Sequence, residues 1–190
     1  MNRHWNAAWL SATLGLVSIV ACSTPSAKSA DTTNPAPSSA SLNDSAKMIA
    51  QNLMKFDTLD FDVFSNQKWD RLKESHAADI IVSWPDGHDT HGIEKHIEDL
   101  KGMFVPMPDL KITEHPIKIA NGSWTAVVGR MTGTFSKPMP IGNGKTIPPT
   151  NKKLDLTMAT IGHWTSAGVM DHEWLFWDNA TYMKQLGLSK

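Results

Sequence analysis

The feature that most restricts the fold of this chain is a change of hydrophobic period close to Asp109. Before this residue, apolar side chains recur at helical spacing, as at Ile93, Ile97 and Leu100. After it, apolar and polar residues alternate as in half-buried strands, over residues 110–120, 124–135, 154–164 and 169–177. Helices followed by consecutive strands indicate an α+β domain with an antiparallel sheet rather than a doubly wound parallel one.

Turn and capping signals set the boundaries of the other elements. Asn121-Gly122 and Ala167-Gly168 have the composition of hairpin turns. Asp178 comes just before the last apolar stretch, so we expect its carboxylate to cap a helix there. We expect helices at 44–56, 67–75, 92–104 and 180–186, and one further strand at 78–84.

The N-terminus has the pattern of an export signal. Arg3 supplies a positive charge, and residues 7–21 contain none. This apolar run is typical of a secretory signal and falls short of the roughly 20 strongly apolar residues of a spanning helix. It ends in Ile19-Val20-Ala21-Cys22, which resembles the lipobox of bacterial lipoproteins. We expect residues 1–21 to be removed as a lipoprotein signal peptide and Cys22 to be lipidated. The alternatives are an uncleaved anchor helix and an ordinary signal cut after Ala21.

The organisation of the remaining chain follows from this assignment. Residues 22–40 are the lipidated cysteine and a linker without large apolar side chains, which we expect to be disordered. Residues 41–190, about 150 in number, are enough for one domain with its own core. We expect this domain at the cell envelope, on the periplasmic side, and at the outer membrane where the host has one. Because the formal net charge is −1 and no basic stripe is present, nucleic-acid binding is excluded.

Tryptophan is frequent, with 8 residues in the chain. Trp84, Trp124, Trp164 and Trp174 fall in or beside the expected strands. Such side chains either fill the core or line a pocket that stacks on an apolar or polycyclic molecule. We take these four as candidate ligand-binding residues.

The last expected hairpin carries polar residues among apolar neighbours. A two-residue turn would place His163 opposite His172, and a one-residue bulge would bring Glu173 there instead. A buried histidine beside a carboxylate suits general acid–base chemistry near neutral pH. His163, Glu173 and His172 are therefore the candidate catalytic residues, although an exposed strand face also carries such residues without any function.

A second group of histidines gives a weaker signal. His88, His91 and His96 follow Asp86, but their spacing matches no known metal-ligand signature. The expected helix should also turn His96 away from His88. There is no Gly-rich phosphate loop and no nucleophile elbow. We therefore expect no metal and no cofactor.

The segment Ile147-Pro148-Pro149-Thr150-Asn151-Lys152-Lys153 resembles the PPT-x-basic-basic stretch of SnoaL-like polyketide cyclases, also called ester cyclases. The hairpin at Gly168 and the ending from Trp177-Asp178 to Gly187 fit the same family, so the resemblance spans residues 42–188. It implies an NTF2-like cone, in which N-terminal helices pack on a curved antiparallel sheet. It also implies ring closure by cofactor-free aldol condensation, with an Asp as base and an assisting His, and a homodimer paired through the sheets.

The resemblance places the family's Asp at Leu175 and its His at Ile161, or at Thr160 if one gap is allowed. Because a leucine cannot accept a proton, either the chemistry has moved to His163 and Glu173 or the domain only binds. We add Leu175 to the candidate ligand-binding residues. The expected function is binding of a small apolar or polycyclic molecule, with or without acid–base chemistry. The alternative is a non-catalytic protein-interaction or dimerisation module.

Overall fold

A computed structural model describes residues 38–189 of the chain. The expected signal peptide, Cys22 and the linker up to residue 37 lie outside the described residues. Helix α1 already begins at Ser39, because the Ser38 hydroxyl caps it by accepting a hydrogen bond from the Ser41 N–H. The end of the expected linker therefore belongs to the domain. Within residues 38–189, no helix has the length and apolar character needed to cross a membrane.

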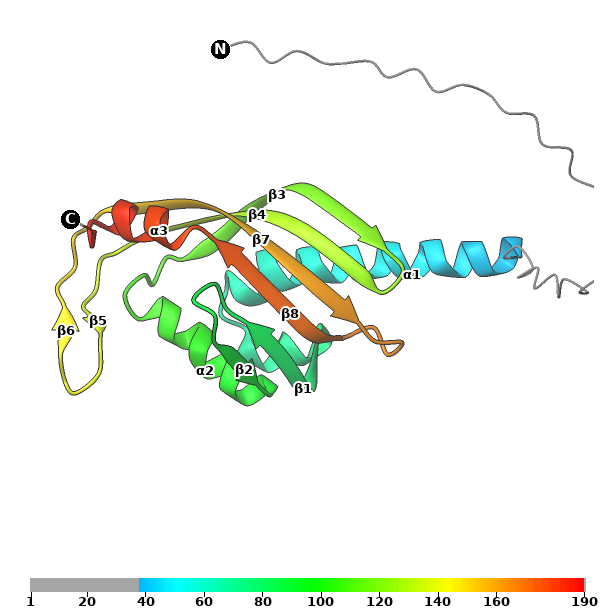
Figure 1. Cartoon of the computed structure of the whole chain (residues 1–190), viewed down its shortest axis with the longest axis horizontal. Helices are drawn as coiled ribbons and strands as arrows, with labels where there is room; N and C mark the ends of the chain where they lie inside the picture. The colour runs from blue at the N-terminus through cyan, green and yellow to red at the C-terminus, as the bar shows by residue number, and fades with distance from the viewer. Residues whose placement is uncertain (1–37, 190) are drawn as a thin grey trace, which may run out of the picture. The chain divides into compact units, whose positions relative to one another are not determined.

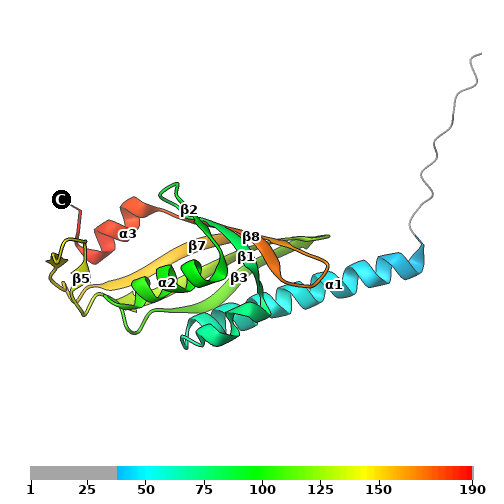
Figure 2. The same ribbon diagram turned by 90° about the horizontal axis from the view of Figure 1, so that it is seen from below.

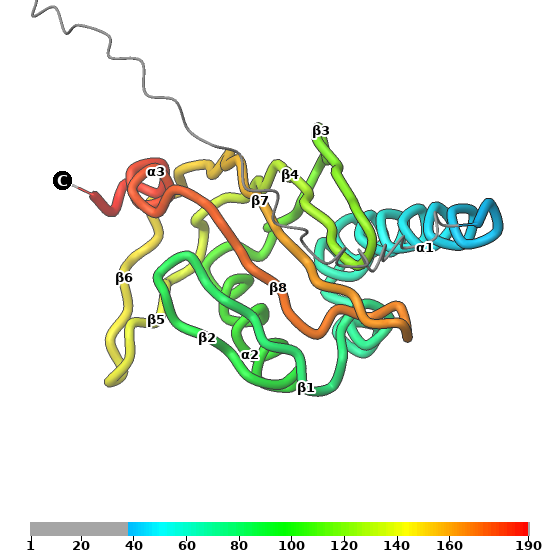
Figure 3. Tube along the Cα trace, turned by 45° about the vertical axis from the view of Figure 1, so that its right-hand side comes forward, coloured from blue at the N-terminus to red at the C-terminus, as the bar shows by residue number. Residues whose placement is uncertain are grey.

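The expected helices and long strands are all present, with bounds shifted by a few residues. The helical segments are α1 (Ser39–Thr58), the π-helical turn η1 (Leu59–Phe64), the 3-10 helix η2 (Trp69–Glu74), α2 (Ile93–Phe104) and α3 (Asn179–Leu186). The strands are β1 (His76–Ser83), β2 (Asp89–His91), β3 (Lys111–Asn121), β4 (Trp124–Thr134), β5 (Met139–Pro140), β6 (Thr146–Ile147), β7 (Lys153–Trp164) and β8 (Met170–Trp177). The sequence patterns missed β2 and the small β5–β6 hairpin, which projects from the sheet in Figure 3.

The main sheet has the strand order β2-β1-β8-β7-β4-β3 (Figure 1). All neighbouring strands are antiparallel except β1 and β8, which are parallel. The sheet is therefore mixed, whereas the sequence led us to expect an antiparallel one. The difference arises because β1 lies outside the β3–β4–β7–β8 meander. It joins the free edge of β8, where no hairpin dictates the direction.

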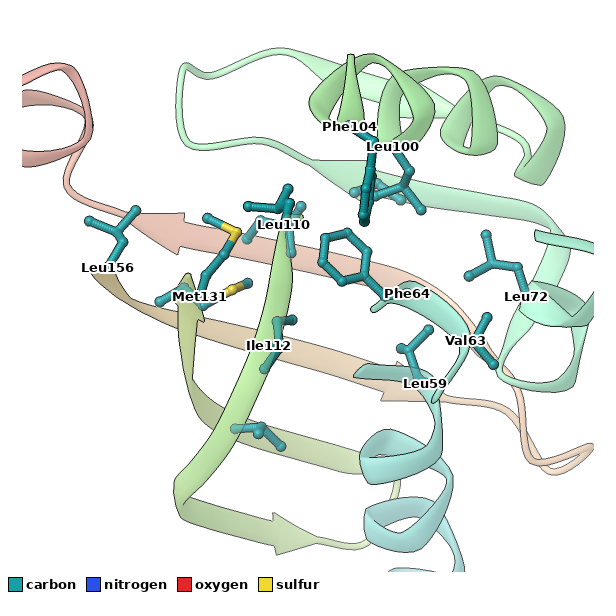
Figure 4. Close-up of a cluster of buried hydrophobic side chains, with 14 of the residues drawn as sticks. Leu59, Val63, Phe64, Leu72, Leu100, Phe104, Leu110, Ile112, Met131 and Leu156 are labelled. Atoms are coloured by element: carbon teal, nitrogen blue, oxygen red, sulfur yellow. The ribbon is translucent and has the colours of Figure 1, made fainter. Parts of the chain in front are cut away.

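The two faces of the sheet have different environments. Side chains alternate between them, so that Glu173 and Leu175 of β8 are buried while Phe176 is exposed. The inner face packs against α1, η1 and α2, which cover it from one side (Figure 2). The apolar side chains between these layers form one core, part of which is shown in Figure 4: Leu59, Val63, Phe64, Leu72, Leu100, Phe104, Leu110, Ile112, Met131 and Leu156.

Helix α3 ends the domain and packs on β7. As expected, its N-cap is Asp178. The Asp178 carboxylate accepts hydrogen bonds from the Ala180 N–H (2.9 Å) and the Thr181 hydroxyl (2.7 Å). Gly187 follows in the left-handed conformation, with φ of 74°, and closes the helix in the way that favours glycine. The two caps fix the position of the chain end against the sheet.

Candidate functional site

A cavity lies between the helices and the inner face of the sheet. Its volume is about 40 Å³, which is room for roughly three water molecules. The wall is mostly apolar and includes Leu59, Phe64, Leu72, Trp84, Leu100, Met103, Ile112, Met131, Met158, Leu175 and Trp177. Its polar members are Asp60, His76, His96, Thr160 and Glu173, and these determine what chemistry the cavity can support.

Three of the polar residues meet around one carboxylate. Glu173 Oε2 lies 3.6 Å from Nε2 of His76 and 3.6 Å from Nε2 of His96. The three side chains come from β8, β1 and α2, and all are buried. The two imidazole rings stack with centroids 5.3 Å apart. At 3.6 Å the nitrogens are in electrostatic contact with the carboxylate but beyond hydrogen-bond distance.

The charges in this cluster follow from burial and proximity. Burial acts to raise the pKa of Glu173, but the two neighbouring histidines outweigh it, and the pKa is lowered. Burial also disfavours the charged form of His96 and lowers its pKa to about 4. At neutral pH the cavity therefore contains a carboxylate facing a neutral imidazole of His96.

A second ionisable pair reaches the cavity from the helical layer. Asp60 lies in the π-helical turn η1, where the Ser65 N–H bonds to the Asp60 carbonyl five residues earlier (3.2 Å) and the Ser65 hydroxyl also bonds it (2.6 Å). Such turns recur at functional sites because they redirect a side chain. The Asp60 carboxylate is 2.8 Å from Nε2 of His115, and Nδ1 of the same ring is 2.8 Å from Asp57.

The pKa values of Asp60 and His115 are both raised, but for different reasons. Burial is the main reason why the pKa of Asp60 is raised, and the hydrogen bond from His115 opposes it only in part. Burial acts to lower the pKa of His115, but the hydrogen bonds to Asp60 and Asp57 outweigh it, and the pKa is raised. Asp57 in turn bonds Lys118 (2.6 Å) at the surface. A continuous hydrogen-bonded chain therefore connects the cavity with solvent.

Comparison with known proteins places the chain in a family. The sequence profile of the SnoaL-like polyketide cyclases matches residues 56–186, which contain every residue of the cavity. The chain belongs to this family. A search of curated proteins found no relative of the chain.

Solved structures show the same fold as this SnoaL-like domain. One of them is a protein from Jannaschia sp. CCS1 that is described as a SnoaL-like polyketide cyclase. It has a TM-score of 0.65 at 20% identity, and the match covers 75% of this chain and 96% of that chain. IdmH from Streptomyces antibioticus has a TM-score of 0.60 at 22% identity, covering 72% and 99%. An NTF2-like protein from Burkholderia pseudomallei has a TM-score of 0.58 at 13% identity, covering 72% and 97%. The expected NTF2-like α+β fold is confirmed.

The SnoaL-like domain does not bring the expected catalytic residues together. His163 and His172 are register partners, as expected, but both lie on the outer face. The turn between them is longer than two residues, because a register shift after His163 pairs Trp164 with Met170. His163 bonds Asp171 (2.6 Å) and His172 bonds Ser83 (3.1 Å). Glu173 is one residue further along β8 and so points to the inner face. His163 and Glu173 therefore lie on opposite faces of the sheet, and of the three candidates only Glu173 reaches the cavity.

The candidate ligand-binding residues also separate. Trp84 and Leu175 line the cavity. Trp124 and Trp174 stack on the outer face with ring centroids 5.6 Å apart. Trp164 is buried in the core and is not part of the cavity wall. The expected pocket lined by these tryptophans therefore does not form, because Trp84 lines the inner cavity whereas Trp124 and Trp174 lie on the opposite face of the sheet.

The resemblance places the family's Asp at Leu175 and its His at Ile161 or Thr160. Thr160 and Leu175 are register partners on β7 and β8, and both line the cavity. Ile161 is not part of the cavity wall.

Three functional candidates were missed from the sequence, namely Asp60, His76 and His115, and His96 was considered only as a partner of His88. For His96 a signal was present, since it lies three residues after Ile93 and four before Leu100, on the apolar face of α2. For the others the partners are far apart in the sequence, and no local pattern connects them.

Proposed function

We propose that this SnoaL-like domain is held at the cell envelope through a lipid on Cys22 and binds a small, largely apolar carbonyl compound in its cavity. Asp60 then removes a carbon-bound proton beside the carbonyl group. The observation that carries the proposal is the position of Asp60. Its side chain lines a mostly apolar cavity, and its carboxylate is hydrogen-bonded to His115. The export pattern of residues 1–22 supports the envelope location.

The surroundings of Asp60 suit proton transfer. A carboxylate with a raised pKa is a stronger base than one in water, and burial raises that of Asp60. The chain through His115 and Asp57 lets the proton exchange with solvent. The Thr160 hydroxyl, which also lines the cavity, can donate to the negative charge that develops on the carbonyl oxygen.

The dimensions of the cavity favour a small ligand over a polycyclic one. About 40 Å³ is far below the several hundred Å³ of a drug-sized pocket. Three methionines in the wall, Met103, Met131 and Met158, can change rotamer at little cost and so enlarge the space. We therefore favour monocyclic or short-chain carbonyl compounds as ligands.

The experiment uses residues 23–190, which contain the whole described core and lack the only cysteine. We expect deuterium from D₂O to enter small cyclic ketones such as cyclohexanone faster than without protein. Asp60→Asn should reduce this rate by about 100-fold or more, because general bases typically contribute at least that factor. Asp62→Asn, an exposed carboxylate on the same turn, is the matched control and should leave the rate unchanged.

Two results would contradict the proposal. One is a wild-type rate no higher than the background for every ketone tested. The other is equal loss in Asp60→Asn and Asp62→Asn. The tether is checked in cells, where labelled palmitate should mark the full chain and not its Cys22→Ser variant.

A second candidate function is self-association through the outer face of the sheet. Four large apolar side chains on this face are exposed: Ile117 by 50%, Ile119 by 62%, Trp124 by 46% and Phe176 by 49%. They extend over β3, β4 and β8, which belong to one sheet. A patch of this kind is characteristic of an interaction surface. We favour a second copy of the chain as the partner, because in a twofold pair the same apolar patch of each copy is buried against the other.

The test is the oligomeric state in solution. We expect residues 23–190 to sediment as a dimer at micromolar concentration and Ile119→Lys to sediment as a monomer, since the lysine would place a charge in the interface. Leu42→Lys, on the exposed side of α1, is the control and should remain dimeric. A monomeric wild-type domain would exclude this function and leave the cavity proposal intact.

A further inference from the structure

We propose that His76, His96 and Glu173 form a binding site for a divalent transition metal of the Zn²⁺ or Fe²⁺ class. The site lies at the cavity wall but does not depend on Asp60, so the inference stands apart from the proposed proton transfer. Its basis is the geometry of the three side chains and the hydrogen bonds that orient one of them.

The first argument is the donor set. One ligand atom from each of the three residues lies within 4.8 Å of the other two. A metal ion binds imidazole and carboxylate at about 2.0–2.2 Å, so one ion can reach all three donors after small rotations. Two histidines and one carboxylate are the protein ligands of many catalytic zinc sites and of non-haem iron sites. Imidazole ligands also select against Mg²⁺ and Ca²⁺, which prefer oxygen.

The second argument is the tautomer of His76. The Ser75 hydroxyl donates to the Leu72 carbonyl (3.2 Å), so its oxygen is left to accept the proton on Nδ1 of His76 (2.9 Å). Nε2 of the ring then carries a lone pair, which faces Glu173 Oε2 at 3.6 Å. A metal ion between these two atoms would be a ligand partner for both of them. The same arrangement, in which one ring nitrogen is held and the other is free, orients metal-binding histidines in general.

The third argument is unsatisfied hydrogen bonding. Nε2 of His76 and Nδ1 of His96 are buried and have no partner among the described residues. Burying polar atoms without a partner costs free energy, and such atoms are rare in folded proteins. Coordination would satisfy the first of them. It would also leave an open position on the metal towards the cavity, where water or a carbonyl oxygen of a ligand can bind.

The elements that supply the ligands are rigid. His76 begins β1 and is the register partner of Met170 in β8, three residues before Glu173. His96 lies on the buried face of α2, which packs on β1. Ligands on two paired strands and a packed helix hold their positions without a metal, so the site requires little reorganisation to bind one.

The experiment measures metal binding directly. Residues 23–190 are stripped with a chelator, dialysed and titrated with Zn²⁺ and with Co²⁺, whose visible absorption reports its ligands. We expect one bound ion per chain and no displacement by excess Mg²⁺. Glu173→Gln and His96→Gln should abolish stoichiometric binding. Ser75→Ala, which removes no ligand, should weaken it by about 10–100-fold. His88→Ala, an exposed histidine paired with Asp86, is the control and should bind like wild type.

The outcomes separate this site from the proton-transfer proposal. Circular dichroism of the metal-free variants shows whether each is folded, and Ser75→Ala keeps the test decisive if a ligand variant is not. Absence of stoichiometric binding to the wild-type domain, or equal binding by Glu173→Gln, would overturn the inference. Asp60→Asn should bind metal like wild type, so loss of ketone exchange with intact metal binding concerns Asp60 alone.

Discussion

Replacing Trp164 by alanine is expected to lower the free energy of unfolding by about 3–5 kcal/mol. The side chain is only 2% exposed, and its ring packs against Phe56 with centroids 6.4 Å apart. Its Nε1–H also donates to the Thr125 hydroxyl (2.9 Å), which is itself buried. The substitution therefore leaves a large void and removes the donor to a buried oxygen, and both effects destabilise the fold.

Urea unfolding followed by far-UV circular dichroism measures this effect without relying on tryptophan fluorescence. The matched control is Trp124→Ala, which removes an equally large side chain that is 46% exposed. It should cost less than about 1 kcal/mol, since it creates no void in the core. Equal costs for the two substitutions would show that the placement of Trp164 in the core is wrong. The comparison distinguishes the two roles, core filling and ligand stacking, that the sequence left open for these tryptophans.

The fold was predictable from the sequence because its signals are local. Hydrophobic period identified α2 and the four long strands of the meander, and Asp178 marked the start of α3. The expected pairing of His163 with His172 is confirmed, although a register shift follows it. The direction of β1 was not predictable, because its neighbour β8 lies almost a hundred residues later and no turn connects them.

The site was less predictable. It depends on which face of the sheet each strand residue occupies and on contacts between residues that are far apart in the sequence. Glu173 and His163 both occur in the last hairpin, and only the alternation along β8, in which Leu175 and Glu173 share the inner face, shows that they diverge. Asp60 meets His115 across 55 residues of sequence. Its direction is set by the π-helical turn, for which the sequence gives no simple signal.

Replacing His115 by phenylalanine is expected to destabilise the domain by about 3–5 kcal/mol near pH 6.5, because it leaves the Asp60 carboxylate buried without its partner. The His115 side chain is 2% exposed and is hydrogen-bonded at both ring nitrogens. Phenylalanine keeps a ring of similar size beside Phe61 and Phe56, so loss of packing contributes little. Asp57 loses one bond but keeps that to Lys118 at the surface.

The stability lost in His115→Phe should first increase and then decrease as the pH rises. The pKa of Asp60 is raised on folding, so its neutral form stabilises the fold below about pH 4 and this contribution is lost as the pH rises through the folded value. In His115→Phe, the hydrogen bond from His115 no longer limits this loss of stability. The pKa of His115 is also raised, so in the wild type its contribution is complete below about pH 6.5 and is lost above it. The difference between the two proteins should therefore be smallest near pH 4, largest near pH 6.5 and smaller again at alkaline pH.

A double-mutant cycle tests whether the buried charge is the cause. Asp60→Asn should recover a large part of the stability lost in His115→Phe, because it removes the ionisable group that His115 neutralises. Asp57→Asn should recover little, since Asp57 is partly exposed and has a second partner. Denaturant titrations of the wild type, the three single variants and the two double variants from pH 4 to pH 9 give the coupling at each pH. A deficit that stays constant with pH, or that Asp60→Asn does not reduce, would mean that His115 acts by packing and does not govern the charge of the residue we assign to proton transfer.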